Sequence, residues 1–442
     1  MICLLVPVLF FTACGDDDEP TPDTTIVGQL AADPDYSLLV AAVQKAGLVS
    51  VLQDASARFT VFAPNNAAFE AAGLNSAAIA ALPDGDANLT RILLYHVLGQ
   101  ELNSTQLASQ TYTTASAAGD FNLLYVNVAS GVKINGAVTV TEANIEASNG
   151  VIHGVDSVIS LPADIATTAT NAGFSILVAA LTRSGIDLST LPGPLTVFAP
   201  TDAAFEAAGL TLTVVNNTAP EVLAAVLSYH VVTGGRTFSD DLVSDIAVEA
   251  ADGNGLYFGI GTAGVFVNEA QITGTDILTT DGVIHVVDRV IGQGTITDLV
   301  VRNPEFASLL GVVGVADADP DIDIAGTLAA DGPFTLFAPD NAAVSALLTE
   351  LGVTNLSGFT TDEVATILTY HVLGAEVFSD DVPNGDVETV AGQNITTAVN
   401  MMSGAVTITD AEERVTNVTS VNINMSNGVV HVIDRVLLPE LP

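Results

Sequence analysis

The sequence predicts an α+β protein made of three domains in tandem. The chain has 442 residues, which is too long for one ordinary hydrophobic core. Three short motifs recur three times in the same order, at domain-sized intervals. Within each repeat, helical patterns come first and alternating, turn-bounded patterns come last, so helices and strands are segregated along the chain.

The three motifs define the repeats. The first is Phe-Ala-Pro, the second Tyr-His-Val, and the third a closing motif of the type Asn/Asp-Gly-Val-Ile/Val-His followed by Asp. We expect domains at residues 25–161, 162–292 and 293–440. The prolines are Pro64, Pro200 and Pro339, the Tyr-His pairs are Tyr95-His96, Tyr229-His230 and Tyr370-His371, and the closing motifs span 149–159, 281–291 and 427–437.

The first half of each repeat reads as helix, short strand and helix. Apolar residues at helical spacing predict an opening helix in 35–48, 173–186 and 305–316. The Thr-Val-Phe-Ala-Pro type run is a short strand that ends at its proline. A helix follows, with Asn66, Asp202 or Asn341 as the expected N-cap, and Phe69 and Phe205 are expected to fill the core.

The second half of each repeat turns to strands. A helix such as 220–230 leads into the Tyr-His pair, and β-rich runs then lie between Gly, Asn and Asp turns. The closing motif begins with Asn-Gly or Asp-Gly and continues with alternating residues, which is a strong hairpin signal.

With these motifs in order, the chain resembles the fasciclin-like domain family over about residues 25–440. The first repeat departs from the others at Gly154 and Ser157, and the third has Val344 in place of phenylalanine. The resemblance implies that each domain is a wedge-shaped β-sandwich decorated with helices. It also implies a non-enzymatic role in extracellular adhesion or matrix association, and it permits the Tyr-His pairs to contact an adhesion partner.

All six histidines lie in the motifs, two in each repeat. Each closing motif adds an aspartate three residues after its histidine, and residues three apart on a strand point to opposite faces. Two histidines are also too few for a strong zinc site. We therefore interpret them as buried hydrogen-bonding residues, with metal binding and catalysis as the alternatives. The closing-motif pairs are His153 and Asp156, His285 and Asp288, and His431 and Asp434.

An acidic loop in the third repeat is a weak calcium candidate. Its carboxylates alternate along the chain, as oxygen ligands for Ca²⁺ do, but the loop lacks the glycine and glutamate of an EF-hand. The alternative is a solvated insertion. The candidate ligands are Asp317, Asp319, Asp321 and Asp323.

Composition and motifs exclude several classes of function. The net charge is −41, with only 10 Lys and Arg, so the surface repels nucleic acid and anionic lipid. The sequence contains no Gly-x-Ser-x-Gly, His-Glu-x-x-His or P-loop signature of catalysis or phosphate binding. We predict an adhesion protein without enzymatic activity, cofactor or structural metal. Its partner would be an extracellular protein or polysaccharide, and the alternative function is a cell-envelope spacer with no specific ligand.

The first residues predict export and a lipid anchor. Residues 1–14 form a short apolar run that ends in Ala13-Cys14, which resembles a bacterial lipoprotein signal with Cys14 as the lipidated residue. An acidic tether, 15–24, follows. These features predict a protein of the outer membrane or cell surface that meets the membrane only through its N-terminal lipid.

Lipidation gives the first testable prediction. Intact-mass analysis of the native protein should show a chain that starts at Cys14 and carries a diacylglyceryl group. An unmodified Cys14 within a longer chain would contradict the anchor.

Overall fold

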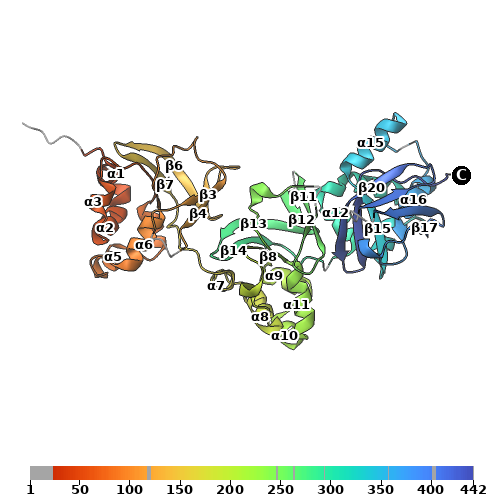
Figure 1. Cartoon of the computed structure of the whole chain (residues 1–442), viewed down its shortest axis with the longest axis horizontal. Coiled ribbons are helices and arrows are strands. Elements are labelled where there is room, and N and C mark those ends of the chain that lie inside the picture. The colour runs from red at the N-terminus through yellow and green to blue at the C-terminus, as the bar shows by residue number, and fades with distance from the viewer. Residues whose placement is uncertain are drawn as a thin grey trace, which may run out of the picture. The chain divides into compact units, whose positions relative to one another are not determined.

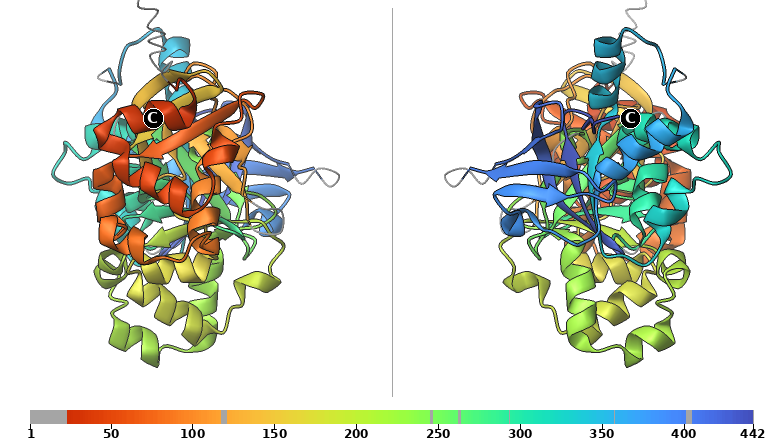
Figure 2. Two further views of the ribbon diagram at one scale, coloured as in Figure 1. Left: turned by 90° about the vertical axis from the view of Figure 1, so that its left-hand side faces the viewer. Right: turned by 90° about the vertical axis from the view of Figure 1, so that its right-hand side faces the viewer.

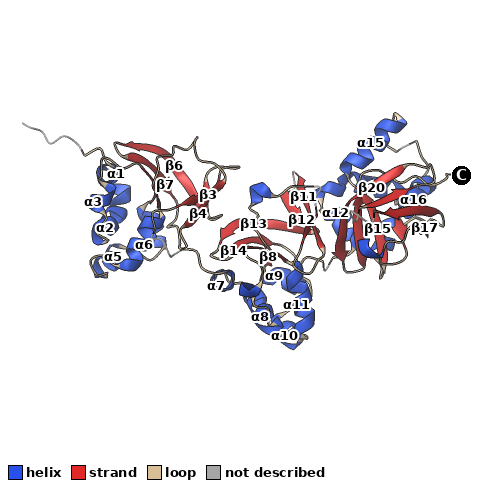
Figure 3. Ribbon diagram, viewed as in Figure 1, coloured by secondary structure: helices blue, strands red, loops and turns tan. Residues whose placement is uncertain are grey.

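The computed structural model describes residues 23–441 except 117–120, 245–246, 262–263, 293, 357 and 401–404. Apart from one three-residue turn, the chain divides into two compact units, one ending at Ser160 and the other beginning at Leu161. The first unit corresponds to the first predicted domain and the second to the other two. Helices and strands are both abundant in each unit, which confirms the α+β class (Figure 3).

The first domain places its helices together on one side of its strands (Figure 1). Its strands follow the order β2-β1-β7-β6-β5-β4-β3. The helical elements are α1 (Ile26–Ala32), η1 (Pro34–Tyr36), α2 (Ser37–Lys45), α3 (Val49–Leu52), α4 (Asn66–Ala71), α5 (Ser76–Ala81) and α6 (Ala87–Tyr95). The strands are β1 (Phe59–Pro64), β2 (Val97–Leu98), β3 (Gln110–Thr113), β4 (Leu123–Asn127), β5 (Lys133–Ile134), β6 (Val138–Ala147) and β7 (Gly150–Val155).

The long strand β6 gives the domain its sandwich-like form. Its C-terminal part pairs with β7, and its N-terminal part pairs with β5. Two register shifts, between Val140 and Ile145, interrupt its pairing with β7. Such bulges bend a strand and increase its twist, so one strand can belong to both layers.

The second domain repeats this order. Its helical elements are α7 (Ile165–Asn171), α8 (Ser175–Ser184), η2 (Leu188–Thr190), α9 (Asp202–Ala207), α10 (Leu212–Asn217), α11 (Pro220–Tyr229) and η3 (Ser239–Asp241). Its strands are β8 (Leu195–Pro200), β9 (Val231–Val232), β10 (Ala247–Glu249), β11 (Gly255–Gly261), β12 (Gly264–Val267), β13 (Ala270–Leu278) and β14 (Gly282–Val287).

The third domain follows the same plan, and Figure 2 shows its dark blue strands on the side away from its teal helices. Its helical elements are α12 (Ile296–Arg302), η4 (Pro304–Phe306), α13 (Ala307–Ala316), α14 (Ile324–Ala329), α15 (Asn341–Leu351), α16 (Thr361–Tyr370) and η5 (Ser379–Asp381). Its strands are β15 (Phe334–Pro339), β16 (Val372–Leu373), β17 (Gly385–Glu388), β18 (Asn394–Val399), β19 (Val406–Thr409), β20 (Val415–Met425) and β21 (Gly428–Ile433).

One sheet runs through both domains of the second unit. Strand β20 of the third domain pairs in parallel with β11 of the second, where Gly255 is the partner of Ile423. Tyr257 of β11 is fully buried and stacks on Phe306, with 5.5 Å between ring centroids. Because Tyr257 packs within the hydrophobic cluster of the third domain, the two domains share part of one core.

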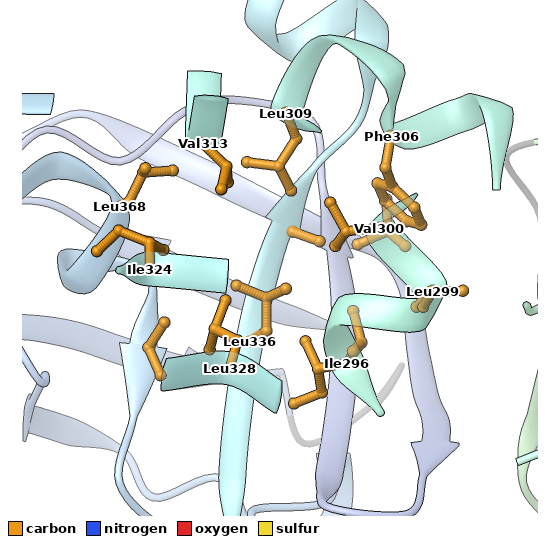
Figure 4. Packing of buried hydrophobic residues seen from close by; sticks show 14 of the residues in the cluster. Ile296, Leu299, Val300, Phe306, Leu309, Val313, Ile324, Leu328, Leu336 and Leu368 are labelled. Carbon is orange, nitrogen blue, oxygen red and sulfur yellow. The ribbon is translucent and has the colours of Figure 1, made fainter. Parts of the chain in front are cut away.

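Hydrophobic side chains from the helices and from strands β15, β20 and β21 fill the core of the third domain, and Figure 4 shows part of this cluster. The described residues include no single helix long and apolar enough to cross a membrane, although the bent pair Ile296–Arg302 and Pro304–Ala316 meets that length and composition. The face that this pair presents to the cluster is buried, as core packing requires. The labelled members are Ile296, Leu299, Val300, Phe306, Leu309, Val313, Ile324, Leu328, Leu336 and Leu368.

The expected helix caps are displaced by one residue. The side chains that cap α4, α9 and α15 belong to Asn65, Thr201 and Asp340. The prediction of Asn66, Asp202 and Asn341 as caps was therefore wrong. These residues lie one position further on. There the side chain points away from its own helix and accepts the backbone amide of Leu38, Ile176 or Ser308, which belongs to an earlier helix of the same domain.

The hairpin glycine of the closing motif is required by a close backbone approach. Gly150 has φ 151°, and a Cβ atom there would lie 2.0 Å from the carbonyl oxygen of Phe59. Gly282 and Gly428 face Leu195 and Phe334 in the same way. The Asn-Gly and Asp-Gly pairs form the predicted hairpins, joining β6 to β7, β13 to β14 and β20 to β21.

A paired exchange explains why the first repeat has Gly154 where the others have valine. A Cβ atom at Gly154 would lie 2.3 Å from the Tyr36 hydroxyl, which donates a hydrogen bond to Glu142 at 3.2 Å. The second domain has Phe174 and Val286 at these two positions. The first domain thus combines tyrosine, the longer aromatic residue, with glycine, whereas the second combines phenylalanine with valine.

This exchange predicts a rescue. Gly154→Val should lower the free energy of unfolding of the first unit by about 1–3 kcal/mol, because the added side chain overlaps the Tyr36 hydroxyl. Tyr36→Phe in the same chain should restore much of that loss, because it recreates the Phe and Val pair of the other domains. Urea denaturation of the wild type, both single variants and the double variant measures the coupling. Strictly additive effects would contradict the proposed overlap.

Candidate functional site

The first and third motifs meet as neighbouring parallel strands. β1 pairs with β7, β8 with β14 and β15 with β21, each over six consecutive residue pairs. In every case the motif phenylalanine is opposite the motif histidine, as Phe62 is opposite His153. Segments that lie far apart in the sequence thus form neighbouring parallel strands in each domain.

The paired side chains also stack. Ring centroids lie 5.8 Å apart for Phe62 and His153, at an interplanar angle of 30°. The corresponding values are 5.6 Å and 24° in the second domain, and 5.7 Å and 26° in the third. Each of these histidines is at most 1% exposed, so its ring is packed inside the domain and closed to solvent.

The second motif joins the same place through the backbone. The Phe62 amide donates to the carbonyl oxygen of His96 at 2.9 Å. Phe198 and Phe337 make the same bond to His230 and His371. All three motifs therefore converge on one phenylalanine in each domain.

The imidazole of the Tyr-His pair bridges the end of a helix and the segment that follows the closing strand. In the first domain, His96 Nδ1 lies 2.8 Å from the carbonyl oxygen of Ile92, and Nε2 accepts the Ile159 amide at 2.9 Å. His230 and His371 make the equivalent pairs of bonds in their own domains. A carbonyl only accepts and an amide only donates, so the ring is neutral with its proton on Nδ1.

Burial lowers the pKa of these three histidines to about 4. The hydrogen bond from Nδ1 to the helix carbonyl acts in the opposite direction, but desolvation of the charged ring dominates. A ring held neutral, with both nitrogens bonded to backbone, has neither a free lone pair for a metal nor access to a substrate.

The closing-motif histidines are held by a different set of bonds. Nε2 of His153, His285 and His431 bonds the carbonyl oxygen of Leu102, Thr237 and Val377, respectively. Nδ1 of His153 and His431 accepts the amide of Asn144 and Asn422, whereas Nδ1 of His285 is buried and has no hydrogen-bond partner among the residues that the structure describes. Desolvation lowers the pKa of all three.

The aspartates of the closing motif lie away from these histidines. Asp156, Asp288 and Asp434 each accept a backbone amide, from Thr139, Gln271 and Asn417, respectively, and so extend the strand pairing beyond the motif. The structure therefore separates the His and Asp side chains, as the strand periodicity predicts.

The tyrosine hydroxyls fasten the helix end to the strand layer. Tyr95 donates to the carbonyl oxygen of Leu123, Tyr229 to that of Gly255 and Tyr370 to that of Asn394. All three side chains are at most 5% exposed. The described contacts of the Tyr-His pairs are thus internal to the fold.

Sequence reasoning missed two further members of this arrangement. A buried threonine lies two residues before each of these phenylalanines. In the first domain, Thr60 donates to the Gln100 carbonyl and accepts the Leu102 amide. Asn144 and its equivalents Asp276 and Asn422 adopt positive φ at a bulge and bind a serine. The available signal was a repeated Asn or Asp before isoleucine in each closing hairpin, at a conformation that these residues tolerate.

The acidic loop of the third domain uses its carboxylates locally. Asp317 accepts the amides of Ile324 and Ala325, Asp323 accepts that of Gly326, and Asp319 accepts that of Asp321. Among the residues described, no three His, Cys, Asp or Glu side chains are grouped to hold a metal ion. The carboxylates of Asp317 and Asp323 therefore cap α14, and the calcium hypothesis gains no support.

Cys14 lies outside the described residues. The polar side chains of the motifs mainly satisfy backbone groups within the fold. The three repeats thus define a class of protein in which a structural module is used in series.

Comparison with known proteins names that module. The family model described as "Fasciclin domain" matches residues 34–162, 172–293 and 315–439, well over half of the chain. The chain therefore belongs to the fasciclin-domain family.

Relatives share this family across kingdoms. Protein sll1483 of Synechocystis sp. is 35% identical over 147 residues, covering 33% of this chain and 74% of that protein. Human periostin is 26% identical over 76% of this chain, which spans only 39% of periostin. A solved structure titled as a FAS1 domain pair from the insect cell adhesion molecule Fasciclin I matches 62% of this chain and 98% of its own, with 18% identity and a TM-score of 0.46.

The low pKa of the bridging histidines predicts that the folded protein loses stability in acid. Their pKa is about 4 in the folded protein and about 6.5 when unfolded, so the unfolded state binds more protons between these values. Stability should fall as pH drops from about 6.5 to 4, by up to about 1.4 kcal/mol per pH unit for each histidine, and this contribution should level off below 4.

His371→Ala tests the assignment. At pH 8 it should destabilise the third domain by about 1–3 kcal/mol for each buried group left unpaired, and it should reduce the loss of stability on acidification. Calorimetry of the full chain across pH measures both effects, with the exposed Val415→Ala as control. An unchanged pH slope in His371→Ala would show that another group titrates.

Proposed function

We propose that this protein is a lipid-anchored, non-enzymatic adhesion protein of the cell surface that binds an extracellular protein or polysaccharide. The observation that carries this proposal is the internal use of the motif side chains, which leaves no described motif histidine exposed. The repeated motifs build the module, so binding falls to the variable loops between its elements.

Repetition supports a role in adhesion. Three copies of one module can engage several weak sites on one surface. Linked weak sites raise apparent affinity by about 10²–10⁴ without any new contact, provided that the geometry allows simultaneous engagement.

The net charge of −41 restricts the partner. Nucleic acid and anionic membranes would be repelled, because binding to either depends on Lys and Arg. A basic or uncharged surface fits better. A basic partner would associate more slowly as salt rises, because charges farther apart than about 10 Å are screened at 0.1 M ionic strength.

Binding and display can be tested separately. Arrays of extracellular matrix proteins and polysaccharides, probed with the full chain in detergent, should give at least one bound class. The apparent affinity for that class should be about 10²–10⁴-fold higher on surfaces that carry the ligand densely than on surfaces that carry it sparsely. Mild protease treatment of intact cells should release fragments of the protein.

Two controls make the result decisive. DNA and phosphatidylglycerol vesicles should stay unbound in the same assay. Protease-resistant protein on intact cells would contradict surface display. Accessible protein that binds nothing on the arrays would favour the spacer function over adhesion.

A further inference from the structure

The junction between the second and third domains contains a buried carboxyl group. Glu269 lies in the tight turn between β12 and β13 and is 0% exposed. Its Oε1 atom accepts the amide of Gly292 at 2.9 Å and that of Gly294 at 3.1 Å. These glycines belong to the segment that leads into α12, so one side chain of the second domain binds the connection to the third.

The same turn also binds the end of α12. Arg302 donates from Nε to the Glu269 carbonyl oxygen at 2.7 Å, and from its Nη2 atom to Asp288 at 2.6 Å. The next residue, Asn303, donates to the Asn268 carbonyl oxygen. The third domain is thus attached at both the start and the end of its first helix.

A second set of contacts lies on the strand side of the junction. The Tyr229 hydroxyl accepts the Asn424 amide at 3.1 Å, and the Ser426 amide donates to the Gly294 carbonyl oxygen at 2.9 Å. Gly294 therefore contacts Glu269 through its amide and the third-domain strand layer through its carbonyl. Displacement of the Glu269 side chain would loosen both attachments.

The second oxygen of the carboxyl group makes the ionised form unfavourable. Glu269 Oε2 is buried and has no hydrogen-bond partner among the described residues. An ionised carboxylate with one unsolvated oxygen is unfavourable, whereas a carboxylic acid with its proton on Oε2 keeps both bonds to Oε1.

Other charged groups at the junction are mostly paired. Asp298 of α12 adds a negative charge near Glu269. Its side chain caps α12, and its Oδ1 atom lies 3.7 Å from Nη1 of Arg289. Arg302 is neutralised by Asp288. Tyr229 is a buried, uncharged phenol. Desolvation is the largest effect on Glu269 and raises its pKa to about 7, against hydrogen bonds from its own backbone amide and from those of Gly294 and Gly292, which lower it.

We propose that Glu269 is a proton-controlled lock between the second and third domains, closed when its carboxyl group is protonated and loosened when it ionises. Opening exposes the side chain to water, where its pKa returns to about 4.5. The closed junction therefore binds the proton more tightly than the open one. Acidification favours the closed form, and this stabilisation is lost as pH rises through about 7.

The size of the effect follows from the two pKa values. With about 7 closed and 4.5 open, the equilibrium constant for opening should rise about 30-fold between pH 5.5 and 8.5, with little further change above that. This dependence has the opposite sign to that of the motif histidines, so the two can be told apart.

Distance measurement between spin labels in the full chain tests the lock. The only cysteines are Cys3 and Cys14, so replacing both by serine allows labels at Val222→Cys and Val415→Cys, which are 56% and 57% exposed in the wild type. We expect one narrow distance distribution at pH 5.5 and an additional broad component at pH 8.5. Glu269→Gln, a neutral analogue of the protonated side chain, should keep the narrow distribution at both pH values.

A matched variant and a second measurement keep the result interpretable. Glu221→Gln, at an exposed position of α11, should behave like the wild type. Hydrogen exchange of the peptide containing Gly292 and Gly294, corrected for intrinsic rates, should be faster at pH 8.5 than at pH 5.5 in the wild type and in Glu221→Gln, and unchanged in Glu269→Gln. A pH-independent wild type, or a Glu269→Gln variant that still broadens at pH 8.5, would overturn the proposal.

Discussion

The parallel pairing of the Phe-Ala-Pro strand with the closing strand is the constraint on which each domain depends. The two strands come from opposite ends of a domain, so their pairing closes a long loop that contains most of the other elements. The stacked phenylalanine and histidine fix the register, because a shift by one residue would turn every buried side chain to the other face. The Tyr-His pair then ties the last helix to this strand pair.

Differences among the three copies show which parts of the arrangement tolerate change. Tyr36 with Gly154 replaces the Phe and Val pair of the other domains, because the Tyr36 hydroxyl occupies the space that a Cβ atom at Gly154 would need. Asp276 stands where the other domains have Asn144 and Asn422, yet the bond to a serine amide remains. Backbone conformation and buried hydrogen bonds are thus kept while side chains vary in pairs.

The sequence predicted what depends on local pattern and missed what depends on contacts between distant segments. Helix periodicity, the Asn-Gly hairpins and the burial of the motif histidines follow from short-range rules. The capping error at Asn66 arose because adjacent polar residues both suit a cap, and only the nearby Leu38 amide decides between them. Glu269 resembles any charged turn residue until the third domain covers it, so the junction could not be inferred from its own repeat.

The junction and the modules respond to acid in opposite directions, and this separates their roles. As pH falls from about 6.5 to 4.5, the bridging histidines bind protons in the unfolded chain, which lowers the stability of each module. Over the same range, protonation of Glu269 favours the closed junction. A protein whose modules and junction both weakened in acid would lose binding geometry and stability together. Here, on the proposed role of Glu269, acidification from about pH 7 to 4.5 stiffens the domain pair while the bridging histidines, with pKa values near 4, stay largely neutral in the folded state. For an adhesion array, stiffness between modules sets how many sites can engage at once, so the carboxyl group of one turn residue would adjust avidity without altering any binding surface.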